Sequence, residues 1–236
     1  MKKSKIILFS ILFFLSIKTA ISCSEENKID EKPKVETGTV TDIDGNVYKT
    51  IKIGTQWWMA ENLLTTKFQN GEAIQNTISN TDWASLSSPS YCFYNNDFET
   101  YGRIYGAFYN WKAVNDNRNI APEGWHIPSD EEWKTLINYL GGFYVAGGKM
   151  KEAGTAHWIS PNTGATNSSG FTALPTGSRG GTTGEYGWIG LGNDYWCATS
   201  NTDTEAWAYY VGNDMAGCLR LSHNKLNGFV IRCIKD

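Results

Sequence analysis

The most regular spacing of apolar side chains lies in residues 129–140, and it predicts a helix. Ser129 stands where an N-cap belongs, and Glu132 follows three residues later, which is the pattern of a capping box. Two glycines come directly after residue 140, as is common at a helix C-terminus. One helical face is expected to be buried, because four large apolar residues recur on it: Trp133, Leu136, Ile137 and Leu140.

Alternating apolar and polar positions predict a β-hairpin near the start of the chain. Residues 39–43 and 47–53 alternate, and Asp44-Gly45 lies between them. Asp42, Asp44 and Asn46 could suggest a calcium loop, but the later ligands and the bidentate glutamate of an EF-hand are missing. Turn chemistry is therefore the preferred interpretation of these side chains.

The C-terminal third has the pattern of an antiparallel meander. Short β-type runs separated by turn residues occur at 195–200, 206–211, 217–221 and 229–234. Residues 91–94 predict one more strand, and the apolar spacing in 101–114 predicts a further helix.

Two long segments lack any regular pattern. Residues 65–90 are rich in Asn, Ser and Thr, and residues 153–190 are rich in glycine. Long ordered loops of this kind often carry function.

The first 22 residues have the composition of a secretory signal. A lysine-rich start precedes an apolar run at 6–17 that is too short to span a bilayer. Ala20-Ile21-Ser22-Cys23 resembles the lipobox of bacterial lipoproteins, which predicts cleavage after residue 22 and a lipid on Cys23. The alternative is an ordinary cleavage that leaves Cys23 as a free N-terminal thiol.

Residues 23–36 are polar and charged, and they predict a flexible acidic tether. Glu25 and Glu26 resemble the surface-export signal of Bacteroidota lipoproteins, although a solvated linker would have the same composition. We therefore expect an outer-membrane lipoprotein that is exposed on the cell surface.

The charge and the aromatic content of the chain limit which classes of binding partner are expected. Without residues 1–22, which hold four lysines and no acid, 17 basic and 24 acidic side chains remain, a formal charge of −7. With no basic run, nucleic acid is not expected as a partner. The 10 Trp, 12 Tyr and 10 Phe suit a surface that stacks on sugars, but they are too numerous for all to contact a ligand, so most are expected in the core.

Four cysteines lie beyond Cys23. An even count in an exported chain predicts two disulfides, with three possible connectivities. No Cys-x-x-Cys spacing and no Cys/His cluster of zinc type occurs, so no metal site and no cofactor are expected.

Several motifs in order resemble the Fibrobacter succinogenes major paralogous domain over residues 37–236. That family is typical of exported lipoproteins and carries no defined biochemical activity. The segments that carry the resemblance lie at 51–63, 101–105, 124–133, 148–155, 162–171 and 227–233.

A more distant resemblance is to the C-type-lectin-like fold, including its formylglycine-generating-enzyme branch. It rests on the helix start at 128–133 and on the terminal Gly-Phe-x-x-Arg at 228–232. The resemblance implies an α+β domain with two helices, a small twisted antiparallel sheet and long loops. It also implies the pairing of Cys92 with Cys233 and of Cys197 with Cys218.

The function expected first is a non-catalytic binding module for glycan or protein ligands. Its candidate contact residues lie in or near the long loop: Trp158, Tyr186, Trp188 and Asp194. The Glu-Pro-Asn, Gln-Pro-Asp and Trp-Asn-Asp motifs of calcium-dependent lectins are absent from the sequence, so calcium-dependent sugar binding is not expected.

Two alternatives belong to other classes. One is an oxidase like the formylglycine-generating enzymes, with Cys218 and His223 as an activated thiolate pair; a structural disulfide beside a surface histidine would explain the same residues. The other is a structural component of a surface adhesin assembly.

Overall fold

The computed structural model describes residues 35–236 of the chain. The predicted signal peptide at 1–22, the lipidation site Cys23 and nearly all of the tether at 23–36 lie outside the described residues. Within the described part, none of the helices combines the length and apolar character that a membrane crossing requires. The domain is of the α+β class, as predicted, with short helices and mainly antiparallel sheets.

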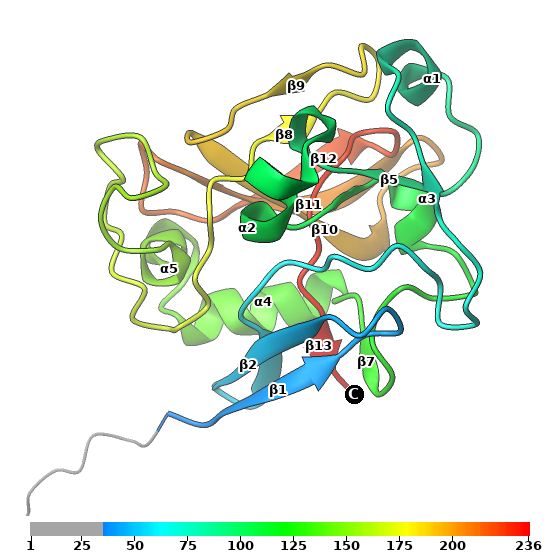
Figure 1. Cartoon of the computed structure of the whole chain (residues 1–236). Coiled ribbons are helices and arrows are strands. Elements are labelled where there is room, and N and C mark those ends of the chain that lie inside the picture. Colours follow the sequence, from blue (N-terminus) through cyan, green and yellow to red (C-terminus); the bar gives the residue numbers. More distant parts are fainter. Residues whose placement is uncertain (1–34) are drawn as a thin grey trace, which may run out of the picture. The chain divides into compact units, whose positions relative to one another are not determined.

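The largest sheet joins the beginning of the domain to its end. Its strands run in the order β1-β2-β3-β13-β7, all antiparallel, and Figure 1 shows them at the base of the domain. Ile234 of the last strand pairs with Trp58 on one side and His126 on the other. The bounds are β1 Thr37–Thr41, β2 Val47–Ile53, β3 Gln56–Met59, β7 Trp125–His126 and β13 Ile234–Lys235.

The predicted hairpin is confirmed as β1 and β2. Its turn is held by Asp42, whose Oδ1 accepts the backbone N–H groups of Asp44 at 3.0 Å and Asn46 at 2.9 Å. Such side-chain hydrogen bonds are typical of a turn, which is the interpretation that the sequence favoured over a calcium loop.

The C-terminal meander is confirmed for three strands, β10 Gly192–Ser200, β11 Glu205–Gly212 and β12 Leu219–Asn224. The fourth predicted strand, 229–234, is wrong as a continuous strand, because only isolated bridges at Phe229 and Val230 precede β13. The buried Arg232 explains the interruption: its guanidinium donates to Asn62 and to the carbonyls of Met59, Phe171 and Thr172, so the chain follows these partners instead of one neighbouring strand.

The remaining strands form two small sheets. In the first, β4 runs parallel to β5 and β5 antiparallel to β6, so the predicted strand at 91–94 is present as β5 with shifted bounds. The second pairs β8 with β9 inside the long loop. The bounds are β4 Gln75–Asn76, β5 Ser90–Cys92, β6 Phe108–Tyr109, β8 Ser178–Arg179 and β9 Tyr186–Gly187.

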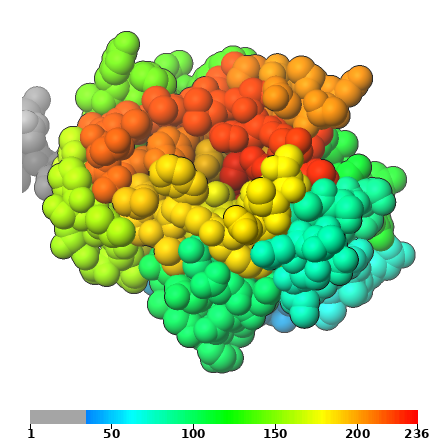
Figure 2. Space-filling model, turned by 90° about the horizontal axis from the view of Figure 1, so that it is seen from above, coloured from blue at the N-terminus to red at the C-terminus, as the bar shows by residue number. Residues whose placement is uncertain are grey.

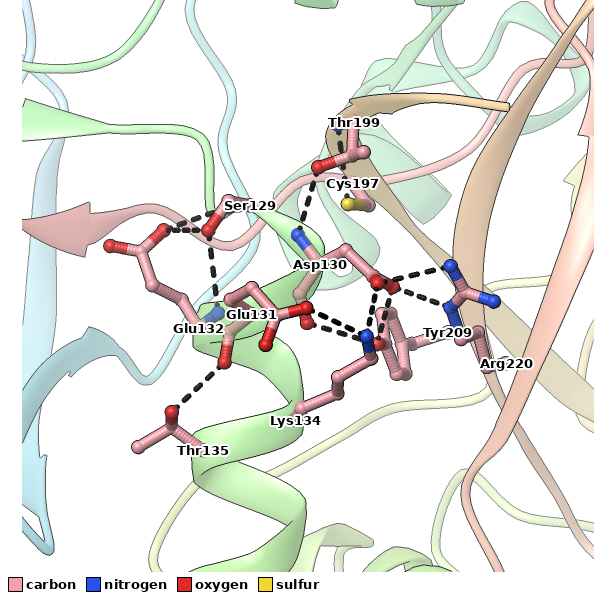
Figure 3. Close-up of polar contacts among 10 residues, drawn as sticks. All are labelled: Ser129, Asp130, Glu131, Glu132, Lys134, Thr135, Cys197, Thr199, Tyr209 and Arg220. Carbon is pink, nitrogen blue, oxygen red and sulfur yellow. Dashed lines mark hydrogen bonds and ion pairs between the residues drawn. The ribbon is translucent and has the colours of Figure 1, made fainter. Parts of the chain in front are cut away.

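The predicted capped helix is confirmed as α4, Asp130–Tyr139, with its capping box formed by Ser129 and Glu132. Figure 3 shows how Asp130 joins this helix to the meander, accepting from Arg220, Lys134 and the Tyr209 hydroxyl. Burial acts to raise the pKa of Asp130, but these three partners outweigh it and lower the pKa. Trp133 of the same helix contacts Trp58 of β3 and Tyr209 of β11, so α4 packs between the two larger sheets (Figure 1).

The helix predicted over 101–114 is wrong. Gly106, with φ of +86°, interrupts it, and a Cβ at that glycine would meet Asn62. The segment instead forms α2 Arg103–Tyr105, β6 and α3 Trp111–Val114.

The second longer helix is α5, Phe143–Met150, which the spacing of apolar residues did not predict. It contains Gly147 and Gly148, which disfavour a helix locally. Both are buried where α5 touches the backbone at Gly217 and Gly164, so tertiary packing requires the glycines. The other helical segments are α1 Asn80–Ala84, a 3-10 turn Tyr94–Asn96 and a π turn Phe98–Gly102.

The predicted disulfides are wrong for the described structure, in which Cys92, Cys197, Cys218 and Cys233 are all free and buried. Cys197 lies on β10, and Cys218 directly precedes β12. Since β11 lies between these strands, the two thiols are two strand spacings apart, farther than a disulfide reaches. Cys92 and Cys233 belong to different hydrophobic clusters of the core.

Candidate binding site

A cavity of about 440 Å³ opens on one face of the meander. We call it the meander cavity. Figure 2 shows the surface hollowed between the yellow long loop and the orange and red segments of β11, β12 and the chain's last part. Its lining residues are Ser178, Gly180, Trp188, Asp194, Tyr210, Leu219, Leu221, His223, Asn227 and Phe229.

Strand register explains why these residues meet. Asp194 of β10 pairs with Tyr210 of β11, and Tyr210 pairs with Leu219 of β12, so the three side chains form one row across the sheet. Leu221 and His223 follow on the same face of β12, because side chains two residues apart share a face. The meander therefore supplies an apolar wall with one acidic and one imidazole group.

Trp188 is the exposed aromatic side chain of this cavity, with 67% of its surface accessible. Its backbone has φ of +67°, a conformation that non-glycine residues rarely adopt. The turn is fixed because the N–H groups of Leu191 and Gly192 both donate to the Trp188 carbonyl. An indole held in solvent by strained backbone is a feature typical of functional sites.

Asp194 and His223 form a loose pair in the cavity. Nε2 of His223 lies 3.3 Å from Oδ1 of Asp194, within the range of an ion pair. Both atoms are nevertheless buried without a hydrogen bond of acceptable geometry. The pair is therefore not a hydrogen bond, because separation alone does not satisfy a polar atom.

The other two predicted contact residues lie elsewhere. Trp158 is 1% exposed, and its indole N–H donates to the Ala173 carbonyl. It is therefore a core residue whose ring is not accessible to a ligand. Tyr186 is half-buried against Phe108 and the Arg179 guanidinium, and its hydroxyl donates to Asn96. Of the four candidates, only Trp188 and Asp194 meet in one cavity.

The thiolate pair of the oxidase hypothesis is not assembled. Cys218 is fully buried, and burial followed by the charge of Asp194 raises the pKa of its thiol to about 12. His223 lies beside Asp194 and Phe229 instead. A thiol in this state is a poor nucleophile at neutral pH.

A larger hollow of about 770 Å³ lies near α3 and the turn between β10 and β11. Two lysines line it, and one of them, Lys225, already donates to Ser200, Thr202 and Asp203 and lies 4.4 Å above the Trp111 ring. These contacts already use the three protons of the Lys225 ammonium, so this cation has no free donor for a ligand.

Within residues 35–236, no three His, Cys, Asp or Glu side chains are grouped so that they could hold a metal ion.

A comparison with protein families finds that the family model described as Fibrobacter succinogenes major domain matches residues 51–235. The match covers the capped helix α4, the long loop and the whole meander cavity. Neither a curated protein nor a solved structure matches the chain.

Proposed function

This chain belongs to the Fibrobacter succinogenes major domain family, and from that premise we propose that it is an exported, lipid-anchored binding module of the cell surface. Its ligand is a glycan, bound in the meander cavity without catalysis. The proposal of an anchor in the outer membrane is supported by the lysine-rich start, the apolar run at 6–17 and Cys23.

The observation that carries the proposal is the placement of Trp188. Its indole projects into solvent at the rim of a cavity walled by Tyr210 and Phe229. A flat aromatic face can stack on the apolar face of a sugar ring, while nearby polar groups bond its hydroxyls. Asp194, Asn227 and Ser178 line the same cavity and are suited to that second role.

We extend the proposal to the fold and assign the domain to the C-type-lectin-like class. Support comes from β13, which lies between β3 and β7 and brings the two ends of the domain together. Further support comes from the capped α4 and from a site built by long loops over a three-stranded meander.

A structural role in a surface assembly is the second candidate. It is favoured by exposed apolar side chains around the junction of α4 and α5, with Tyr144 83% exposed. Contiguous exposed apolar surface often marks a protein contact. The residues are Tyr139, Phe143, Tyr144 and Val145.

The test is a polysaccharide binding panel on the chain from residue 24 onward, with calcium and with EDTA. We expect binding that survives EDTA and falls by about two- to tenfold in Trp188→Ala, since an aromatic stacking contact contributes about 0.5–1.5 kcal/mol. Tyr144→Ala, which removes an exposed ring outside the cavity, is the matched control and should bind normally.

Binding that requires calcium would contradict the predicted absence of a metal. If no glycan binds and the chain self-associates, with the association lost in Tyr144→Ala, the structural role replaces the glycan proposal.

A further inference from the structure

The chemistry of the meander cavity narrows its ligand beyond sugars in general. The cavity combines aromatic rings from Trp188, Tyr210 and Phe229 with one carboxylate, Asp194. No lysine or arginine of the described residues lines it. The inference below rests on the proposed function, since it concerns the same cavity.

Asp194 is an unusual acid for its surroundings. It is 9% exposed, yet its Oδ1 is buried and takes no hydrogen bond from any residue in 35–236. Two other titratable groups line the cavity, His223 and the Tyr210 hydroxyl, and the nearer contact given is Nε2 of His223 at 3.3 Å from Oδ1 of Asp194, in poor hydrogen-bond geometry. A buried carboxylate without hydrogen bonds is costly unless a partner is supplied.

Two carboxylates act on the Tyr210 hydroxyl of the cavity. Its pKa is raised, first by burial and then by the charges of Asp194 and Asp214. Both charges oppose ionisation of the hydroxyl, so two carboxylates make the local potential negative. A positively charged ligand group would be stabilised there.

The rings of the cavity also lack a cation. Elsewhere in the described part, aromatic rings carry the protein's own cations, such as Arg220 3.3 Å above Trp207 and Arg118 3.7 Å above Phe68. Trp188 and Tyr210 carry none. An exposed indole in the same cavity as a carboxylate with an unsatisfied oxygen is suited to an organic ammonium group.

We infer that the meander cavity selects glycans with free ammonium groups, that is, non-acetylated amino sugars. The ammonium donates hydrogen bonds to Asp194, and the sugar ring lies against Trp188. An N-acetylated sugar keeps the ring that stacks on Trp188 but replaces the cation with a neutral amide, so it offers Asp194 only an uncharged N–H donor, which makes a weaker hydrogen bond than an ammonium does.

The test compares the glucosamine hexamer with the N-acetylglucosamine hexamer by calorimetry on the chain from residue 24. We expect the wild type to prefer the glucosamine hexamer about tenfold, the size of one charge-assisted hydrogen bond. Asp194→Asn should abolish this preference, whereas Trp188→Ala should weaken both hexamers. Asp203→Asn makes the same charge change at an exposed turn and should keep the preference.

Rising salt gives a second measurement on the wild type, which is needed if Asp194→Asn does not fold. It should weaken the glucosamine hexamer more than its acetylated counterpart. Equal binding of the two hexamers would overturn the ammonium inference and leave the proposed function standing.

Failure of both hexamers together with the wider panel would overturn both proposals. Tight binding of trilysine, lost in Asp194→Asn, without binding of either hexamer would assign the ammonium to a peptide and overturn the amino-sugar inference.

Discussion

Two tryptophans of the long loop illustrate how the fold gives identical side chains different roles. Trp158 is 1% exposed and bonds the Ala173 carbonyl, while Trp188 is 67% exposed at the cavity rim. The sequence offers both as loop aromatics near glycines. Only the tertiary path of the backbone, with its positive φ at Trp188, distinguishes a core ring from a surface ring.

The four free cysteines of the described domain are expected to be unreactive in the folded protein. Cys92, Cys197, Cys218 and Cys233 are all buried, and burial raises the pKa of each thiol. We expect no reaction with a thiol reagent such as DTNB in the native chain from residue 24, and four equivalents after unfolding in urea. Fewer than four equivalents without reductant, restored by reductant, would show that disulfides form.

An ionic cluster, which we call the clamp, joins β7, α4 and the residue that follows β13. Nε2 of His126 in β7 lies 2.8 Å from Glu132 of α4, and Nδ1 lies 2.6 Å from Asp236 after β13. Burial acts to lower the pKa of His126, but the bonds to Asp236 and Glu132 outweigh it and raise the pKa above 6.5. Burial acts to raise the pKa of Glu132, but Ser129 and His126 lower it below 4.5.

The clamp therefore stabilises the fold within a pH window. The contribution of His126 is complete below 6.5 and is lost as pH rises through its higher folded pKa, whereas that of Glu132 is lost as pH falls through its lower folded pKa. His126→Gln should lower the free energy of unfolding more at about pH 5.5 than at about pH 9.

The expected effect of His126→Gln is below about 1 kcal/mol, because the His126 and Asp236 side chains are 38% and 61% exposed. Urea titrations at several pH values measure it, with Asp203→Asn as a control that should show no such dependence. A His126→Gln effect that is equal at both pH values would exclude the clamp.

Local signals were enough to predict some elements and none of the long-range contacts. The capping box of α4 and the Asp-Gly turn between β1 and β2 are fixed by neighbours in sequence, so both were predictable. Gly106 and the glycines of α5 are required because segments distant in sequence pass too close to leave room for a side chain. The same holds for the site: Trp188 and Asp194 were named, but Tyr210 and His223 join them only through strand register.

Buried cations bind the long loop, residues 153–190, to the rest of the domain. Arg179 donates to the carbonyls of Thr77 and Ile78, and Arg232 to those of Phe171 and Thr172. Each links residues 153–190 to another part of the chain, mainly through backbone oxygens. Carbonyls lie along every segment, so no charge pattern in the sequence marks these contacts.

Lys151 allows the role of these cations to be tested. Its Nζ donates to the carbonyls of Thr163 at 3.0 Å, Gly212 at 2.7 Å and Met215 at 2.8 Å. Burial lowers the pKa of this lysine to about 8, so at pH 7 it is mostly an ammonium with three protons for three acceptors. The side chain thus holds together the loop, the end of β11 and the turn after it.

Lys151→Met keeps most of the volume and removes the donors, which leaves three carbonyls without partners. We expect the free energy of unfolding at pH 7 to fall by about 3 kcal/mol or more, at about 1–3 kcal/mol for each unsatisfied buried group.

Lys149→Met, two residues earlier on α5 and only half-buried, is the matched control and should stay within about 0.5 kcal/mol of the wild type in urea titrations. If the two variants are equally stable, the buried ammonium does not fasten the loop. If only Lys151→Met is destabilised and it also loses glycan binding, the loop that carries Trp188 depends on that ammonium for its position.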